Sequence, residues 1–304
     1  MRISTQAASQ SALMDLMRAQ REAFDAREQL STGKKAADLK GYANSAETIL
    51  TARSAQVRAE GFIDANQRLA SRLEVQDLAY RELSDAASEL RESLTTTDGT
   101  ALMNNVQAAF DRVVSALSTK FAGSFVFSGM RTDSAPLNAS TLTELQAAAP
   151  DTSAVFENAE RRQTAQIDGE TTLDVNRTAS EVAGDLIAVF ERIADFDQGA
   201  NGPFDGPMNA AQQAFIQTEI GNVIGAFETI NDAMAENGSK QARVEASVRG
   251  HQERSDYLTQ MIADLEDADM AEAASRLTQA QTAVEVSART FASLSQVSLL
   301  PFLR

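Results

Sequence analysis

The sequence lacks several residue types whose absence limits its chemistry: it has no cysteine, no tryptophan and a single histidine in 304 residues. Without cysteine, disulfides, thiolate nucleophiles and cysteine-ligated zinc or iron–sulfur centres are excluded. No apolar run approaches the roughly 18 residues of a membrane-spanning helix, so we expect no membrane insertion. The start, Met1 to Gln6, turns polar at once. It lacks the apolar stretch of a secretory signal, so we do not expect the general secretory route.

Basic residues are also scarce, since 27 Lys and Arg stand against 43 Asp and Glu, for a net charge of −16. A strongly acidic surface repels nucleic-acid phosphates and anionic lipid headgroups, so we expect no nucleic-acid partner. Apolar residues make up 43% of the chain but aromatic residues only 6%. Small and aliphatic apolar material of this kind is typical of long helices and coiled coils.

Two long segments carry a heptad repeat, one from Ala52 to Leu94 and one from Ile216 to Leu265. Steps of three and four residues alternate along both, which predicts long helices with one apolar stripe each. Neither stripe can be buried alone, so we expect the two helices to pair as an antiparallel rod. The Gly238-Ser239 pair and the polar seam positions Asn237 and Gln241 favour a kink or a loosened seam in the second helix. The predicted rod seam comprises Leu69, Leu73, Tyr80, Leu83, Leu90, Leu94, Ile216, Ile220, Val223, Phe227, Ile230, Leu258 and Ile262.

The sequence between the rod helices changes its period. A shorter amphipathic helix with apolar residues from Leu102 to Leu117 fills a third side of the bundle, and residues 124–127 predict a strand. Asp168-Gly169 predicts a hairpin turn between two further strands. Thr178 and Glu181 fit a capping box that opens another helix. Residues 121–208 are therefore expected to form a small mixed insertion.

Each end of the chain is one amphipathic helix with sparse large apolar residues. Ordering a residue costs ~1 to 2 kcal/mol of backbone entropy, whereas a buried Leu or Phe contributes ~1.5 to 3 kcal/mol. Neither end is expected to be stable alone, so the two should pair with each other and with neighbouring subunits. The predicted assembly interface comprises Leu13, Leu16, Met17, Phe24, Leu30, Leu277, Val284, Phe291, Leu294, Leu299, Leu300, Phe302 and Leu303.

These patterns predict three parts and a mainly α fold. Residues 1–43 with 266–304 form the terminal helices, residues 44–120 with 209–265 form the helical rod, and residues 121–208 form the outer domain with a β-hairpin. The expected architecture is an antiparallel coiled-coil or helix-bundle rod, built from N- and C-terminal segments, that carries a small α+β insertion.

Short segments at both ends and in the middle resemble the flagellin superfamily. They are residues 1–5, residues 29–34 with Leu-Ser-Thr-Gly, residues 267–274 and residues 298–300. Residues 123–136, which begin Gly-Ser-Phe-Val-Phe-Ser-Gly, are most similar to the hook-filament junction proteins of this superfamily. Those proteins usually have an Asp-rich turn around a proline after Gly-Lys, whereas this chain continues with Ala-Ala-Asp-Leu-Lys-Gly.

The resemblance implies a structural subunit of the bacterial flagellum that connects hook to filament and performs no catalysis. The terminal helices would form the inner core of a hollow fibre and the rod the layer around it, while the insertion would face outward. The implied partners are further copies of the chain, the neighbouring hook-associated protein and flagellin. Export would use a cytoplasmic chaperone and the flagellar type III apparatus, which places the protein in the extracellular flagellum.

Two alternatives remain open. The shared terminal segments also fit a filament flagellin, the major polymer subunit. The heptad repeats alone would also fit a cytoplasmic coiled-coil scaffold.

No residue pattern supports an enzyme, a metal site or a cofactor. His251, the only candidate base for a Ser-His-Asp triad, falls on the heptad seam, where a polar seam residue is the simpler interpretation. Glu266, Asp267 and Asp269 lack the further ligands and glycine of a calcium loop, so helix capping or a solvated face is expected. The Gly33-Lys34 pair lacks the other residues of a phosphate loop.

Overall fold

The computed structural model describes residues 2–148 and 151–299. Helix accounts for 73% of the residues, which confirms the mainly α fold. Contacts divide the chain into two compact units, a terminal unit of residues 1–59 with 253–304 and a central unit of residues 60–252. None of the helices in the described ranges is long and apolar enough to cross a membrane.

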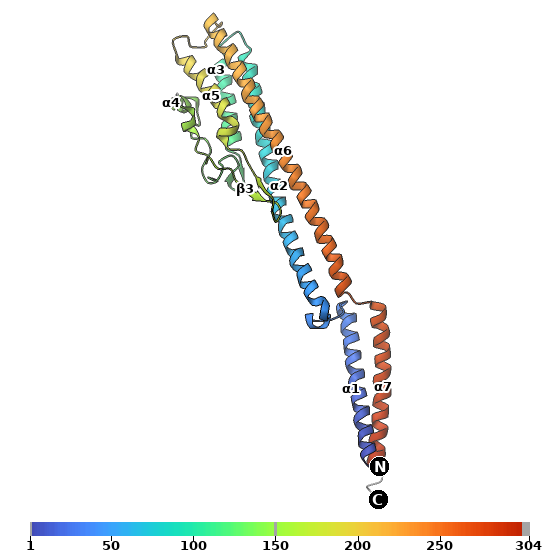
Figure 1. Ribbon diagram of the computed structural model, residues 1–304. Coiled ribbons are helices and arrows are strands. Elements are labelled where there is room, and N and C mark those ends of the chain that lie inside the picture. The colour runs from blue at the N-terminus through green and yellow to red at the C-terminus, as the bar shows by residue number, and fades with distance from the viewer. Residues whose placement is uncertain (1, 149–150, 300–304) are drawn as a thin grey trace. The chain divides into compact units, whose positions relative to one another are not determined.

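The terminal unit is built around two helices from opposite ends of the chain, α1 (Arg2–Thr32) and α7 (Met270–Leu299). They pack side by side and antiparallel (Figure 1). The short 3-10 helix η1 (Leu39–Ser45) follows α1. The unit also contains the first turns of α2 (Ala46–Leu94) and the last turns of α6 (Ala210–Glu266).

The two connections of the terminal unit are hydrogen bonded to each other. Gly33 ends α1 with a φ of 70°, a conformation that glycine adopts without strain. Its carbonyl accepts a 2.8 Å bond from the Ala268 amide, and the Lys35 amide donates a 2.7 Å bond to the Glu266 carbonyl. In the segment that departs from the junction-protein pattern, Asp38 caps η1 by accepting from the Gly41 amide. Where junction proteins usually have an Asp-rich turn around a proline, this chain thus has a local side-chain cap.

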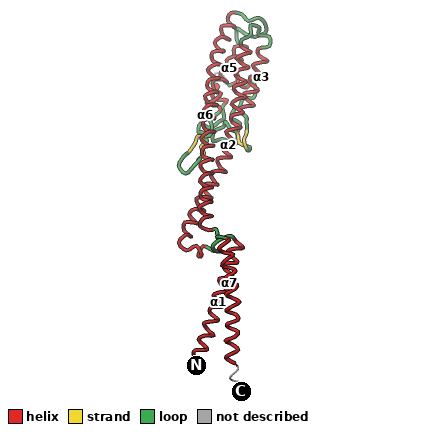
Figure 2. Tube along the Cα trace, turned by 90° about the vertical axis from the view of Figure 1, so that its right-hand side faces the viewer, coloured by secondary structure: helices red, strands yellow, loops and turns green. Residues whose placement is uncertain are grey.

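The central unit packs α3 (Leu102–Leu117) and α5 (Ala179–Gln198) against the rod helices α2 and α6 (Figures 1 and 2). The rings of Tyr80 and Phe127 meet edge to face with centroids 5.3 Å apart, and those of Phe110 and Phe190 do so at 5.4 Å. All four side chains are fully buried. One continuous apolar core therefore joins both rod helices to the insertion.

Of the thirteen predicted rod-seam residues, eleven are buried, and Ile220 and Phe227 are half-buried against the core. At Gly238, where a kink or a loosened seam is predicted, α6 continues without a break from Ala210 to Glu266. The polar seam residues beside it make contact with α2. Asn237 and Gln241 both donate side-chain hydrogen bonds to the carbonyl of Leu73 in α2, so the seam is bridged at that point.

The insertion begins with a two-residue hairpin of β1 (Lys120–Phe121) and β2 (Ser124–Phe125). The strand predicted over residues 124–127 is shorter: β2 ends at Phe125, the Val126 amide still donates to the Thr119 carbonyl, and the Val126 and Phe127 side chains are buried in the core. Two short helices follow, α4 (Leu142–Ala147) and the 3-10 helix η2 (Thr152–Val155).

The predicted second hairpin is present, with β3 (Thr164–Gln166) paired antiparallel to β4 (Thr172–Asp174). The Asp168 carboxylate accepts from the amides of Glu170 and Thr171, which stabilises the turn. Thr178 and Glu181 form the expected capping box at the start of α5.

Candidate assembly interface

Alanines line the contact between α1 and α7. Ala12, Ala19 and Ala26 recur at seven-residue intervals along α1 and are buried, and Ala273 and Ala280 are their counterparts on α7. Heptad spacing keeps these positions on one face of each helix, and the small side chains let the backbones approach closely. The fully buried positions of this seam are therefore small residues.

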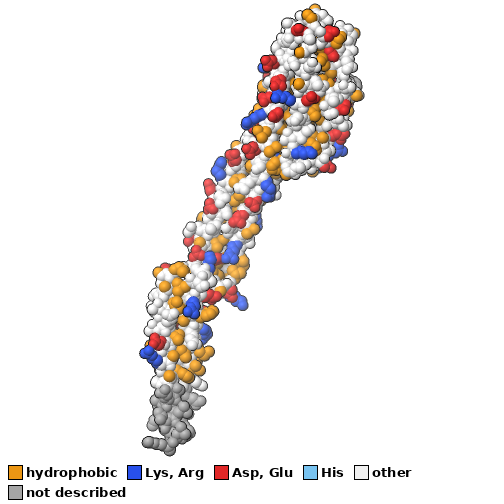
Figure 3. Space-filling view, turned by 180° about the vertical axis from the view of Figure 1, so that it is seen from behind, with side chains coloured by type: hydrophobic (Ala, Val, Ile, Leu, Met, Phe, Trp, Pro, Cys, Tyr) orange, Lys and Arg blue, Asp and Glu red, His pale blue; other side chains and the backbone are white. Residues whose placement is uncertain are grey.

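Large apolar side chains of α1 lie outside this seam. Phe24 is 66% exposed, Met17 52% and Leu13 42%, and their spacing of four and seven residues puts them on one flank of the helix. Met14, beside this flank, and Val286 on α7 are also exposed. Figure 3 shows hydrophobic side chains at the surface of the α1–α7 pair on the face in view. Several exposed large apolar residues on one flank of a helix indicate an interaction site.

Each side of the helix pair carries a shallow groove. One groove, of about 350 Å³, is lined by Phe24 from α1 and by Leu277 and Val284 from α7, among others. The other, of about 370 Å³, is lined chiefly by polar and charged residues, among them Glu22, Asp25, Arg276 and Gln279. The first groove therefore has the larger apolar side chains in its lining, and the second has more charged and polar ones.

The predicted interface residues fall into three groups. Leu13, Met17 and Phe24 are exposed on α1. Leu299 is the last residue of α7, and Leu300, Phe302 and Leu303 lie outside the described residues. The half-buried group alternates with the buried alanines at steps of three and four residues, so it belongs to the α1–α7 seam; it comprises Leu16, Leu30, Leu277, Val284, Phe291 and Leu294.

The sequence reasoning missed the alanine seam itself, as well as Met14 and Val286. The signal was present in the seven-residue spacing of Ala12, Ala19 and Ala26 and of Ala273 and Ala280.

In the same unit, an ion-pair cluster links the connection that follows α1 to the connection that precedes α7. The buried Glu266 carboxylate lies 2.6 Å from Arg53 Nη2 and 3.3 Å from Lys34 Nζ. Lys34 also lies 2.7 Å from Asp267 Oδ1. The hydrogen bond to Asp267 raises the pKa of Lys34, with Glu266 adding to the effect. The cluster therefore keeps its charges paired at neutral pH.

The three acids weighed as a cation site are used within the chain. Glu266 and Asp267 are paired as above, and the Asp269 carboxylate accepts from the amides of Ala271 and Glu272, capping α7. No group of three or more acids, histidines or cysteines among the described residues could hold a metal ion.

His251 occupies a structural position in the central unit. Its ring stacks on Phe62 with centroids 4.9 Å apart, and its Nε2 lies 3.2 Å from the Ile167 carbonyl. Since a carbonyl can only accept, Nε2 carries the hydrogen. The same carbonyl accepts from Asn66 and Ser247, both at 2.8 Å. The β3–β4 hairpin is thereby fastened to both rod helices.

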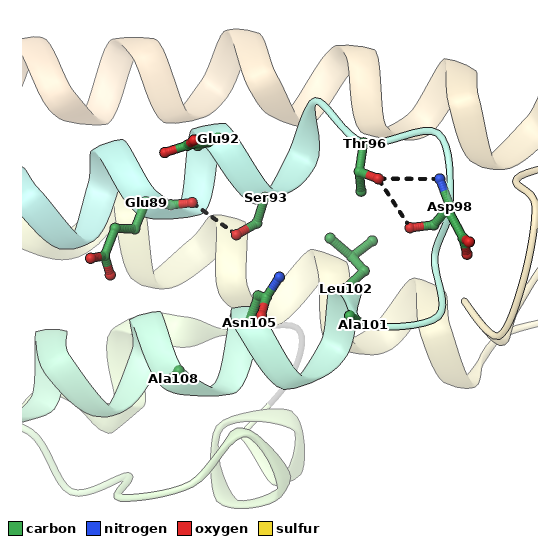
Figure 4. A pocket seen from close by; sticks show the side chains of 9 residues that line it. All are labelled: Glu89, Glu92, Ser93, Thr96, Asp98, Ala101, Leu102, Asn105 and Ala108. Atoms are coloured by element: carbon green, nitrogen blue, oxygen red, sulfur yellow. Dashed lines mark hydrogen bonds between the residues drawn. The ribbon is translucent and has the colours of Figure 1, made fainter.

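A separate hollow of about 450 Å³ lies between the end of α2 and the start of α3 (Figure 4). Two of its carboxylates are engaged within the chain. Glu89 lies 2.5 Å from Arg112, and Asp98 accepts from the hydroxyl and amide of Thr100, which lowers the pKa of Asp98. The hollow contains no arrangement that identifies a ligand.

Comparison with known proteins gives two family matches. Residues 3–132 match the bacterial flagellin N-terminal helical region, and residues 220–303 match the bacterial flagellin C-terminal helical region. Together the matches cover more than two thirds of the chain. No curated protein sequence matched significantly.

Two solved structures share the fold at low sequence identity. One is a protein of Vibrio parahaemolyticus assigned to the flagellar hook-associated proteins. It has a TM-score of 0.59 and 16% identity, over 72% of this chain and 96% of that one. The other, Bacillus cereus FlgL, has a TM-score of 0.52 and 12% identity, over 71% of this chain and 99% of that one.

Proposed function

Because the chain belongs to the flagellin superfamily, we propose that it is the subunit that joins the flagellar hook to the filament. Whether or not it has this junction role, it is a structural protein of the flagellum. The finer assignment is supported by the segment at residues 123–136 and by the two solved structures of similar fold, one named as a flagellar hook-associated protein and the other as FlgL. In the proposed role the terminal helices pack into the wall of a fibre.

The α1–α7 pair carries this proposal. The fully buried positions of the seam are alanines and its larger side chains are only half-buried, so the pair gains limited stability from apolar burial, at about 0.8 kcal/mol per buried CH₂. The large side chains that would supply the missing stability, Met17 and Phe24 above all, point away from the seam and remain exposed. Packing against other subunits would bury them, so the pair is completed by assembly.

Further copies of the same chain are the proposed principal occupants of the apolar groove. The groove at Phe24 and Leu277 runs along the pair, and the exposed flank of α1 continues it toward Leu13. In a ring of identical subunits, this apolar surface would pack against a different face of the next pair, a heterologous contact that closes by rotation. At the two faces of such a ring, hook-associated protein and flagellin would replace the next copy.

One glycine of the segment at residues 123–136 has a structural role in this chain. Gly129 has a φ of 64°, and a Cβ there would lie 2.7 Å from the Arg161 carbonyl and 2.8 Å from the Ala159 carbonyl. No other residue fits the backbone at that point. This glycine, in the segment that resembles junction proteins, therefore fixes the path of the chain after β2.

Export through the flagellar type III apparatus with a cytoplasmic chaperone belongs to the same proposal.

Deletion of the gene tests the junction role. Hooks should remain intact while filament protein is lost to the medium, and a plasmid copy of the gene should restore filaments. Normal filaments in the deletion strain would overturn the proposal.

Copy number separates the junction role from the alternatives. A trace band in purified flagella fits a junction subunit, whereas a dominant band would identify a filament flagellin. Recovery solely from the cytoplasm of flagellated cells would favour a scaffold.

A further inference from the structure

Methionine carries all of the sulfur chemistry of this chain, because there are nine methionines and no cysteine. The described methionines differ sharply in exposure. Met208 is 7% exposed, whereas Met14 is 62%, Met130 60%, Met17 52% and Met270 48% exposed. Peroxides reach exposed thioethers first, since oxidation follows accessibility. Four methionines are thus candidates for modification.

Two of these four, Met14 and Met17, stand one helical turn apart on α1. Met17 lies on the same flank as Leu13 and Phe24, and Met14 borders it. A modification there would fall on the surface that is buried on assembly. Met130 lies in the central unit, in the turn after β2, and is an internal reference of nearly equal exposure.

We propose that Met14 and Met17 form a sulfoxidation site through which a hydroperoxide blocks assembly of the free subunit. The inference rests on the proposed function, because it requires this flank to be buried between subunits. The thioether sulfur attacks one peroxide oxygen, the S–O bond forms and the O–O bond breaks. The sulfur loses two electrons, and the other oxygen leaves as water or an alcohol after taking up a proton.

The sulfoxide changes the character of the surface without changing the length of the side chain. Methionine is apolar and flexible and fills irregular gaps, whereas its sulfoxide is strongly polar and chiral. Burying that polar group against apolar neighbours without a hydrogen-bond partner is unfavourable. The free subunit is therefore sensitive to oxidation, and the assembled subunit is protected because the sulfurs are covered.

The test uses the purified full-length chain and hydrogen peroxide. Mass spectrometry quantifies oxidation at each methionine, and sedimentation measures self-association in ammonium sulfate, which strengthens apolar contacts. The wild type is compared with Met14→Leu/Met17→Leu and with the control Met130→Leu. Leu is close to Met in volume and helix propensity. Each variant is compared with its own untreated sample, so a basal change in assembly does not enter the result.

Oxidation should raise the concentration needed for self-association about tenfold in the wild type and in Met130→Leu. In Met14→Leu/Met17→Leu it should raise that concentration less than about twofold. Methionine sulfoxide reductases should restore association of the oxidised wild type. In preassembled protein Met14 and Met17 should react more slowly, while Met130 reacts as before.

Three results would overturn the inference. They are unchanged association after both sulfurs are oxidised, equal sensitivity of the Met14→Leu/Met17→Leu variant, and equal oxidation of Met14 and Met17 before and after assembly. Failure of the untreated wild type to associate at all would overturn both this inference and the proposed function.

Discussion

The side-chain amide of Asn237 donates a 2.9 Å hydrogen bond to the backbone carbonyl of Leu73, which links α6 to α2 within a largely aliphatic seam. Gln241 donates to the same carbonyl at 3.0 Å. The Oδ1 atom of Asn237 is buried and has no partner among the described residues. A polar residue at such a position fixes the register of two helices at a cost in stability.

Asn237→Leu should therefore leave the free energy of unfolding unchanged or raise it by about 1 kcal/mol, because it removes an unpartnered buried oxygen. Gln241 still bonds the Leu73 carbonyl in this variant. Thermal and urea unfolding followed by circular dichroism measure the change. A loss of more than about 2 kcal/mol would show that the Asn237 bond itself stabilises the seam.

Two leucines of α2 form a matched pair for the rod core. Leu83 is fully buried and Leu78 is 56% exposed. Leu83→Ala should cost about 2 to 5 kcal/mol through lost burial and the cavity left behind. Leu78→Ala should change the free energy of unfolding by less than about 0.5 kcal/mol. Urea unfolding of both variants checks the burial pattern, and similar costs would contradict it.

The central unit should lose stability in acid through the carboxylates around Arg162 and Arg177. Burial raises the pKa of Glu181, but hydrogen bonds from Arg162 and Thr178 outweigh it, so its pKa lies below the usual value. The pKa of Glu236 is also lowered: burial raises it, but hydrogen bonds from Lys240 and Arg177 outweigh that effect. A carboxylate with a lowered folded-state pKa stabilises the fold above its unfolded pKa. That contribution is lost as the pH falls through the folded value.

Unfolding in urea between neutral pH and about pH 3 measures this dependence. Stability should fall below the ordinary glutamate pKa of 4.5, and Glu181→Gln should flatten the fall. The variant should also be less stable than the wild type at neutral pH. An unchanged pH profile in the variant would show that protonation of Glu181 does not contribute to the pH dependence of the free energy of unfolding.

Phe24→Ser tests the exposed flank of α1. The side chain is 66% exposed, so the helix content and thermal unfolding of the monomer should change little, while self-association should weaken. Ala19→Leu is the converse variant, since Ala19 is buried and a larger side chain overpacks the seam. It should loosen the α1–α7 pair in the monomer, seen as lost helical signal. Normal association of the Phe24→Ser variant would contradict the proposed packing.

Protease should cut the terminal helices of the isolated monomer first. The cuts should fall within residues 1 to about 40 and 268 to 304, because α1 and α7 pair through alanines and half-buried side chains and open locally more readily than the aromatic core of the central unit. Timed digestion with mass spectrometry of the fragments should leave a resistant middle. Equal protection of the ends in a verified monomer would count against this.

The rod was predictable because large aliphatic residues at heptad spacing give a strong signal, as at Leu83 and Leu90. Only the alanine positions of the α1–α7 seam were missed, because alanine adds little to an apolar pattern that Phe24 and Met17 dominate. At Gly238 the sequence could not show that Asn237 and Gln241 would both bond to the Leu73 carbonyl.

The insertion was predictable only where turn and cap chemistry is local. The Asp168 turn and the Thr178 cap were predicted, but α4 and η2 were not. The length of β2 also escaped prediction, because it depends on the tertiary packing of Val126 and Phe127.

The backbone hydrogen bonds between Gly33 and Ala268 and between Lys35 and Glu266, which flank an antiparallel bridge, have a mechanical consequence. The chain enters and leaves the α1–α7 pair at this one place, so any tension or torque on the pair passes through it. Together with the ion pairs of Glu266, these bonds share the load between the two polypeptide connections. Neither connection then has to bear a pull alone.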